Sequence, residues 1–224
     1  MVQDRSLARR LAEEGVERGD ALGWFESLYQ QASGDAAGIP WADGAANPNL
    51  VAWLEEKSIA GGNQRALVVG CGLGDDAQRL AELGFSVTAF DISATAIEWC
   101  RRRFANSAVN YCVCDLFSPP ADWKASFDFV FEAYTLQVLP PDMRTAAMTR
   151  IAECVAPGGT LLAIARGCDA DEAPGQMPWP LLQEELNHFA TCGLDVVKLE
   201  DYVDDEEPPV RRFRAEFRRT GQSA

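Results

Sequence analysis

Short apolar runs alternate with amphipathic stretches through the middle of the chain. Runs typical of strands buried on both faces occupy residues 66–69, 85–90, 109–113, 127–131 and 160–165. Helical spacing separates them, for example over 142–155, with Ser93 placed to cap one helix and Gly84 to end another. This alternation predicts an α/β fold: a doubly wound, mostly parallel sheet with helices on both faces.

The last third of the chain has a different pattern. Residues 181–190 have helical spacing, whereas 194–200 and 210–218 are predicted strands. The connection between these strands, 204–209, is too short for a crossover helix, so we expect them to be antiparallel neighbours. The expected sheet therefore has seven strands, one of them antiparallel, as in Rossmann-like folds.

Residues 1–46 are predicted to form a helical N-terminal arm or lid, and residues 47–224 the core domain. Apolar residues recur at helical spacing over 3–31, where three glycines weaken the helix, and a short helix is expected after Asn47 with Pro48 at its first position. The aromatic residues of the arm either close over a ligand or bury one side of a helix; they are Trp24, Phe25, Tyr29 and Trp41.

Charge argues against polyanionic partners. The chain has 34 acidic and 20 basic residues, a formal charge of −14, which repels phosphate backbones and anionic lipid. We therefore expect neither a nucleic-acid nor a membrane partner, and a monomer by default. The arginines of 210–218 alternate with apolar residues, so they are expected on a solvated face, with local pairing to the acids of 204–207.

Cysteine and histidine usage argues against a metal site and a disulfide framework. The chain has seven cysteines without a CxxC pair, and one histidine, His188, which we expect to be an ordinary helix residue rather than a base. No apolar run approaches the roughly 18 residues of a membrane span, and the first residues lack an apolar signal core. These features predict a cytoplasmic protein with reduced thiols.

Three features follow successive predicted strands, where open α/β sheets bind ligands. Gly70, Gly72 and Gly74 allow a sharp turn and a close approach of backbone to ligand. Asp91 ends the next strand and is placed to accept hydrogen bonds from ribose hydroxyls, although a carboxylate there also suits a helix N-terminus. Asp115 and Leu116 follow the third strand, where an adenine ring would lie. Together they predict an adenosine pocket.

The same segments resemble, in order, five motifs of the class I S-adenosylmethionine-dependent methyltransferases. These are residues 67–74 (LVVGCGLG), 90–93 (FDIS), 114–117 (CDLF), 127–132 (FDFVFE) and 155–161 (VAPGGTL). The resemblance implies S-adenosyl-L-methionine as the cofactor. The residues it implies for cofactor binding are Gly70, Cys71, Gly72, Asp91, Ile92, Asp115, Leu116 and Glu132.

A finer resemblance concerns the branch that contains thiopurine, thiol, halide and tellurite-resistance methyltransferases. It lies in residues 39–41 (IPW) and 93–97 (SATAI), and it implies that Trp41 helps to wall the cofactor and substrate cavity. The acceptor implied is a small molecule, a thiol or another soft nucleophile, methylated by direct in-line displacement. The alternatives are a small-molecule O- or N-methyltransferase, a nucleotide-cofactor oxidoreductase and a non-catalytic binding module.

Residues after the fourth strand are expected to lie between methyl group and acceptor. Glu132 is a candidate catalytic base or sulfonium partner, or a strand-end carboxylate that makes a local hydrogen bond. Tyr134 either orients the acceptor through its hydroxyl or packs.

Overall fold

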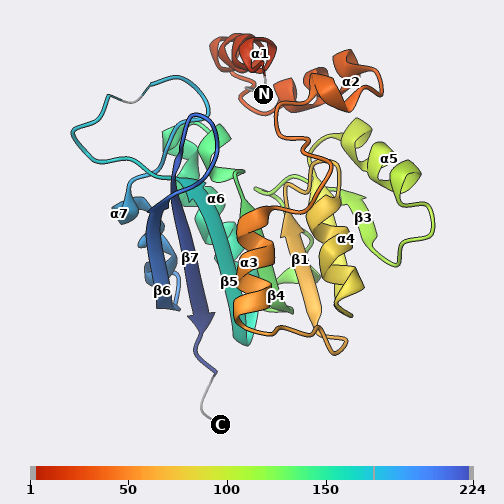
Figure 1. The fold of residues 1–224 in the computed structure, drawn as a ribbon, viewed down its shortest axis with the longest axis vertical. Coiled ribbons are helices and arrows are strands. Elements are labelled where there is room, and N and C mark those ends of the chain that lie inside the picture. The colour runs from red at the N-terminus through yellow and green to blue at the C-terminus, as the bar shows by residue number, and fades with distance from the viewer. Residues whose placement is uncertain (1–3, 174, 222–224) are drawn as a thin grey trace.

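A seven-stranded sheet in the order β3-β2-β1-β4-β5-β7-β6 forms the centre of the computed structural model, which describes residues 4–173 and 175–221 (Figure 1). The strands are β1 (Arg65–Val69), β2 (Ser86–Asp91), β3 (Asn110–Val113), β4 (Phe127–Ala133), β5 (Val155–Arg166), β6 (Leu194–Val203) and β7 (Arg211–Arg219). Strands β1 to β5 pair in parallel, and β7 is antiparallel to both β5 and β6. The predicted fold class is confirmed, with β7 as the antiparallel strand.

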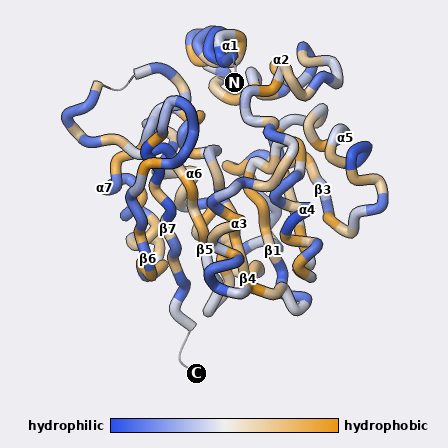
Figure 2. Tube along the Cα trace, in the orientation of Figure 1, coloured by the Kyte–Doolittle hydropathy of each residue, from blue (hydrophilic) through white to orange (hydrophobic). Residues whose placement is uncertain are grey.

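Helices cover both faces of the sheet. One face carries α3 (Pro48–Glu56), α4 (Asp75–Glu82) and α5 (Ala94–Arg103), and the other carries α6 (Pro141–Cys154), α7 (Gln183–Leu186) and α8 (His188–Thr191). In β1, Ala66 and Val68 pack with the first group, whereas Leu67 and Val69 pack with the second. Both faces of the central strands therefore need apolar side chains, and Figure 2 shows this hydrophobic centre.

The predicted helix caps at Asn47 and Ser93 are confirmed, whereas some predicted element boundaries differ from the structure. The Asn47 side chain accepts a hydrogen bond from the Asn49 N–H at the start of α3, and Ser93 Oγ accepts one from the Ala96 N–H at the start of α5. The segment 181–190 is two four-residue helices that meet at Asn187. Strand β5 begins at Val155, before the predicted start at residue 160. Three 3₁₀ turns complete the elements: Ala36–Gly38, Ala121–Trp123 and Leu136–Val138.

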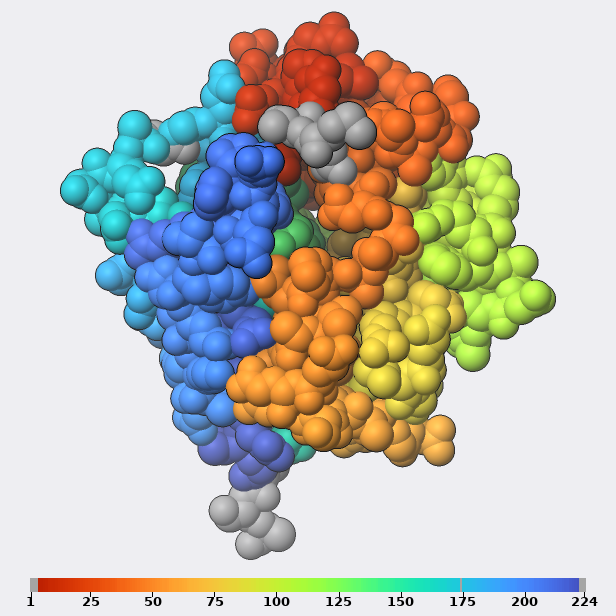
Figure 3. All heavy atoms as spheres, viewed as in Figure 1, coloured from red at the N-terminus to blue at the C-terminus, as the bar shows by residue number. Residues whose placement is uncertain are grey.

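The N-terminal arm lies across the carboxyl ends of the parallel strands, as the red and orange atoms of Figure 3 show. It contains α1 (Ser6–Glu17) and α2 (Gly23–Ala32), separated by a turn in which Gly19 has φ +75°. Trp24 and Leu28 are buried in a cluster with Trp99 of α5. Trp24 therefore packs rather than lining a cavity. The division at residue 46 stays a prediction.

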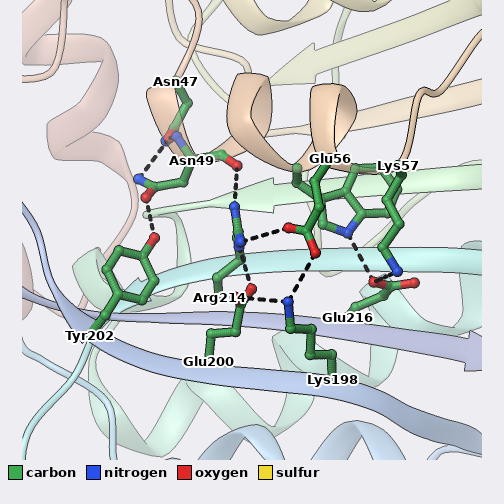
Figure 4. A network of polar contacts seen from close by, with 10 residues as sticks. Asn47, Asn49, Glu56, Lys57, Lys198, Glu200, Tyr202, Arg214 and Glu216 are labelled. Atoms are coloured by element: carbon green, nitrogen blue, oxygen red, sulfur yellow. Dashed lines mark hydrogen bonds and ion pairs between the residues drawn. The ribbon is translucent and has the colours of Figure 1, made fainter.

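The predicted solvated face of β7 is wrong at Arg212 and Arg214, which are 2% and 9% exposed, whereas Arg218 is exposed as predicted. Arg212 pairs with Asp204 and Glu206 of the β6–β7 connection, as predicted for the acids of 204–207, and α3 covers Arg214 (Figure 4). Arg214 pairs with Glu200 at 2.6 Å and with Glu56 of α3 at 3.2 Å (Figure 4). Glu216, two residues on, accepts a hydrogen bond from Trp53 Nε1 of α3 at 2.9 Å. The alternation with apolar residues is real, but its polar side is an internal ion-pair network between helix and sheet.

Glu26 of α2 joins the arm to the core. Its carboxylate accepts hydrogen bonds from the Ser93 hydroxyl at 2.6 Å, the Thr95 hydroxyl at 2.6 Å and the Thr95 N–H at 3.1 Å. Negative charge at a helix N-terminus is favourable, and Glu26 lies at the first turn of α5. Burial alone would raise the pKa of Glu26, but the hydrogen bonds from Ser93 and Thr95 outweigh it and lower the pKa.

Replacing Glu26→Gln should destabilise the protein at pH 7 by about 1–2 kcal/mol, since charge-assisted hydrogen bonds are lost. A lowered folded-state pKa gives stability that is present above the ordinary Glu value and is lost as the pH falls through the folded value. The difference from wild type in urea unfolding should therefore begin to shrink as the pH falls below the ordinary Glu pKa of about 4.3, and it should disappear at still lower pH. Glu13→Gln, an exposed change on α1, is the control and should have no effect. A pH-independent difference would contradict this role.

Candidate active site

A cavity of about 1060 Å³ lies at the carboxyl ends of the parallel strands, beneath the N-terminal arm. Figure 3 shows a hollow between the β6–β7 loop in blue and the orange segment that leads into α3. This volume is at the upper end of the roughly 300–1,000 Å³ typical of small-molecule sites, so it has room for a cofactor and an acceptor.

The glycine loop after β1 forms part of the cavity wall, and its glycines are required by conformation. Gly70, Gly72 and Gly74 have φ of +58°, +52° and +87°, values that favour glycine. A Cβ on Gly70 would lie 2.4 Å from Thr135 Oγ1, and one on Gly74 would lie 2.8 Å from Tyr111 Oη. At Gly72 the space opens toward the arm. A Cβ there would meet the tips of Tyr29 and Trp41 at 3.4 and 3.5 Å.

Cys71 lies in the same loop as a neutral thiol. A hydrogen bond with Cys100, together with burial, raises the pKa of Cys71 well above its ordinary value. The side chain therefore contributes shape and polarizability to the wall and has no nucleophilic role.

Asp91 holds the glycine loop to the following helix. Its carboxylate accepts hydrogen bonds from the Gly72 N–H at 3.0 Å and the Ser93 N–H at 2.9 Å, and the residue is 7% exposed. Both interpretations of Asp91 are thus compatible with the geometry, because it caps the loop before α5 and also lines the cavity. Burial, opposed by these hydrogen bonds, raises the pKa of Asp91 to about 6.

The other predicted cofactor residues, apart from Glu132, also line the cavity: Trp41, Ile92, Asp115 and Leu116. Trp41 donates from Nε1 to Tyr29 Oη at 2.8 Å, and Phe25 lies edge-on to the Trp41 ring. Asp115 accepts a hydrogen bond from the Phe117 N–H at 2.8 Å. Three of the arm's four aromatic residues, Phe25, Tyr29 and Trp41, therefore face the cavity.

Glu132 lies behind the wall of the cavity. The side chain is fully buried, and its Oε1 accepts hydrogen bonds from the backbone N–H groups of Thr135 and Leu136 at 2.8 and 3.1 Å. Oε2 is buried without a hydrogen-bond partner among the described residues. Burial raises the pKa of Glu132 to about 7. This geometry favours the local hydrogen-bonding role, since the carboxylate shapes the loop and does not line the cavity.

Tyr134 lines the cavity in a strained conformation. Its φ is +66°, a region that costs a non-glycine residue about 1–3 kcal/mol and that is concentrated at functional sites. Its hydroxyl accepts a hydrogen bond from Asn49 Nδ2 at 3.3 Å, and the Arg212 guanidinium lies 4.9 Å from its ring centre. Asn49 in turn accepts a hydrogen bond from the Tyr202 hydroxyl (Figure 4). The hydroxyl of Tyr134 is therefore oriented by α3.

Sequence reasoning missed the residues that close the cavity where α3, β5, β6 and β7 contribute to it, a region that we call the acceptor end. Asn49, Tyr202, Arg166 and Arg212 all line it, together with Arg5 of the arm. Asn49 and Tyr202 carry no local signal, because they meet only when α3 packs on β6. Arg166 had one usable signal, as a cation one residue beyond a predicted strand.

The lining fits S-adenosylmethionine. The missing Cβ of Gly72 leaves space beside Tyr29 and Trp41, and Asp91 presents a buried carboxylate next to this loop. Gly70, Gly72, Asp91, Asp115 and Leu116 would hold the adenosine. Among the described residues, no cluster of His, Cys, Asp and Glu could hold a metal ion, and no helix is long and apolar enough to cross a membrane.

Comparisons with known proteins agree with this arrangement. A methyltransferase-domain family model matches residues 66–159. Probable thiol methyltransferase 2 of Arabidopsis thaliana is 28% identical over 203 residues, 88% of this chain and 82% of that protein. Thiocyanate methyltransferase 1 of Brassica oleracea is 30% identical over 131 residues, 56% of this chain and 55% of that protein, so this chain spans about half of it.

A solved structure extends the likeness of fold to nearly the whole chain. The 1,6-didemethyltoxoflavin-N1-methyltransferase of Burkholderia thailandensis, with bound 1,6-didemethyltoxoflavin and S-adenosylhomocysteine, superposes with a TM-score of 0.67 at 20% identity. The match covers 93% of this chain and 89% of that chain.

Replacing Asp91→Asn should weaken binding of S-adenosylhomocysteine by about tenfold or more, because hydrogen bonds to a charged acceptor are lost. Since the pKa of Asp91 is raised to about 6, the affinity of wild type should also decline as the pH falls below that value. Isothermal titration calorimetry at pH 5 to 8 measures both effects. Asp195→Asn, exposed on β6, serves as control. Equal affinity of Asp91→Asn and wild type would remove Asp91 from the cofactor site.

Glu132→Gln tests whether Glu132 acts as a base. Gln keeps an acceptor oxygen for Thr135 and Leu136, so turnover should stay within about threefold of wild type rather than fall by the ~10²–10⁴ expected on losing a base. A raised folded-state pKa makes wild type lose stability relative to this variant as the pH rises from about 4 to 7, by roughly 1–3 kcal/mol. A hundredfold loss of turnover with intact cofactor binding would restore Glu132 as a base.

Motif order, sheet topology and known relatives converge on one family. Three of the five motifs contribute residues that line the cavity, and the other two lie in β4 and at the start of β5; the family model covers four of them in full and part of the fifth. The cofactor is S-adenosyl-L-methionine, and the reaction is methyl transfer to a small molecule. The chain is therefore an S-adenosylmethionine-dependent methyltransferase with a Rossmann-like fold.

Proposed function

We propose that the methyl acceptor is a thiol or another soft nucleophile. Two relatives are named for sulfur-containing acceptors: a probable thiol methyltransferase and a thiocyanate methyltransferase. The observation that carries the proposal is the lack of a suitable base at the acceptor end of the cavity, as far as the structure describes it. A thiol has an ordinary pKa of about 8.5 and supplies some thiolate at neutral pH without help.

The groups near the acceptor end that could accept a proton are paired with arginine, exposed to solvent or distant. His188, the one histidine of the chain, bonds to Thr149 Oγ1 at 2.9 Å and is not a lining residue. Asp204 pairs with Arg212 at 2.6 Å, and Glu206 pairs with the same guanidinium. Burial would raise the pKa of Asp204, but hydrogen bonds from Val210 and Arg212 lower it overall. A carboxylate held this way is a poor proton acceptor.

S-adenosylmethionine, when bound, supplies a methyl group on a sulfonium sulfur. A thiolate placed opposite that sulfur takes the methyl as a new S–C bond forms, the old one breaks and S-adenosylhomocysteine leaves; the thiol proton goes to solvent. The chain orients the partners and excludes water. In this proposal Tyr134 orients the acceptor, Trp41 and Tyr29 wall the cavity, and residues 1–46 act as the lid.

A second candidate is an amine or hydroxyl acceptor, and one residue favours it. Asp76 of α4 lines the cavity and accepts a hydrogen bond from the Asn47 N–H at 2.6 Å. Burial raises the pKa of Asp76 to about 6, near the range useful for a general base. The N1-methyltransferase of similar fold has a nitrogen acceptor.

The proposal places the protein in a reducing cytoplasm as a monomer without nucleic-acid partners. All seven cysteines are free in the structure, which supports the reducing compartment. The net charge of −14 supports the absence of nucleic-acid partners.

A panel of thiols, amines and phenols of similar size tests the acceptor class. We expect kcat/KM for thiols to exceed that for the other acceptors by about tenfold or more, because the described residues at the acceptor end include no suitable base. Asp76→Asn retains the acceptor oxygen for Asn47 and should leave thiol methylation intact. Efficient methylation of an amine or phenol, lost in Asp76→Asn while binding of S-adenosylhomocysteine is kept, would replace the thiol proposal with the second candidate.

A further inference from the structure

Two arginines face each other across the antiparallel strands at the acceptor end of the cavity. Arg166, the last residue of β5, is the direct register partner of Arg212 on β7. Direct partners in an antiparallel pair project from the same face, and like charges so placed destabilise a sheet. Both residues line the cavity, and Arg5, immediately before α1, lines it with them.

The two facing arginines differ in their partners. Arg212 forms ion pairs with Asp204 and Glu206 and lies over the ring of Tyr134. The Arg166 guanidinium has neither a hydrogen bond nor an ion pair within the described residues, and its Nε is buried without a partner. Burial, with Arg5 and Arg212 nearby, lowers the pKa of Arg166 to about 10. The positive charge of Arg166 is therefore destabilised by burial and by two neighbouring arginines.

The negative charges nearby do not satisfy this cation. Asp204 and Glu206 already form ion pairs with Arg212. The other acids that line the rim, Asp43, Asp205 and Glu207, are exposed, where solvent and salt screen them. A partly buried guanidinium without a partner is unfavourable, and its planar fork matches a carboxylate in a bidentate manner.

We propose that the methyl acceptor carries a carboxylate, which Arg166 binds at the acceptor end of the cavity with Arg5 beside it. As a statement about the substrate, this inference rests on the proposed function; as a statement about an anion site, it can be tested by binding alone. The favoured substrate class is therefore a mercaptocarboxylate. Because Arg5 belongs to the N-terminal arm, the same carboxylate would also tie the arm to β5.

Matched acceptors that differ only in charge provide the kinetic test. In wild type, kcat/KM for 3-mercaptopropionate should exceed that for 3-mercaptopropionamide by about 10- to 100-fold, as a charged hydrogen-bonded pair predicts. Arg166→Gln should bring this ratio close to one, and Arg218→Gln, exposed on β7, should leave it as in wild type. A ratio near one in wild type, or a ratio unchanged by Arg166→Gln, would overturn the proposal.

Binding measurements separate this inference from the thiol proposal and from the cofactor's own carboxylate. In the presence of S-adenosylhomocysteine, 3-(methylthio)propionate should bind wild type at least about tenfold more tightly than its amide does, and Arg166→Gln should abolish the preference. If this holds while no thiol is methylated, the anion site stands and the thiol proposal fails. If Arg166→Gln instead weakens S-adenosylhomocysteine itself by tenfold, the guanidinium holds the cofactor's carboxylate and the inference is overturned.

Discussion

The buried carboxylate of Asp91 fixes the geometry on which the rest of the site depends. It receives the N–H of Gly72 from the loop after β1 and the N–H of Ser93 before α5, so two loops from adjacent strands are held in one position. The Ser93 hydroxyl in turn donates a hydrogen bond to the Glu26 carboxylate of the arm. A single chain of polar contacts thereby connects the glycine loop, the second strand and the element that covers the cavity. Desolvation of Asp91 is the cost of this arrangement, and it makes the carboxylate a ready acceptor for ligand hydroxyls.

The acceptor end is built differently, from contacts between parts of the chain that are distant in sequence. Asn49 of α3 contacts Tyr134 after β4 and Tyr202 of β6, and Arg212 of β7 covers the Tyr134 ring. These contacts hold a strained tyrosine in place, and such strain persists only where the surroundings over-determine it. At the acceptor end, Tyr134 is thus rigidly supported, and Arg166 lines the same cavity without an ion-pair partner among the described residues. A site that selects and orients a small charged acceptor is expected to have both features.

Sequence reasoning reached the cofactor half of the cavity because its signals are local. Glycines at 70, 72 and 74, Asp91 at a strand end and Ser93 as a helix cap each act within a few residues of their position. The burial of Arg212 and Arg214 was not predicted, because alternation along β7 does not reveal that the β6–β7 connection pairs with Arg212 and that α3 covers Arg214. Glu132 was ambiguous for a similar reason, since only the packed loop shows which way a strand-end carboxylate is turned.

The cofactor is expected to bind where the glycine loop, Asp91 and the arm meet. Amide hydrogen exchange with and without S-adenosylhomocysteine tests it most directly, since it reports each segment separately. We expect slower exchange in the bound protein over 70–76, 91–96 and the arm segment 24–42, with no change in the distant β6 edge over 194–199. Tight binding without protection of 70–76 and 91–96, or with protection confined to the opposite end of the sheet, would contradict it.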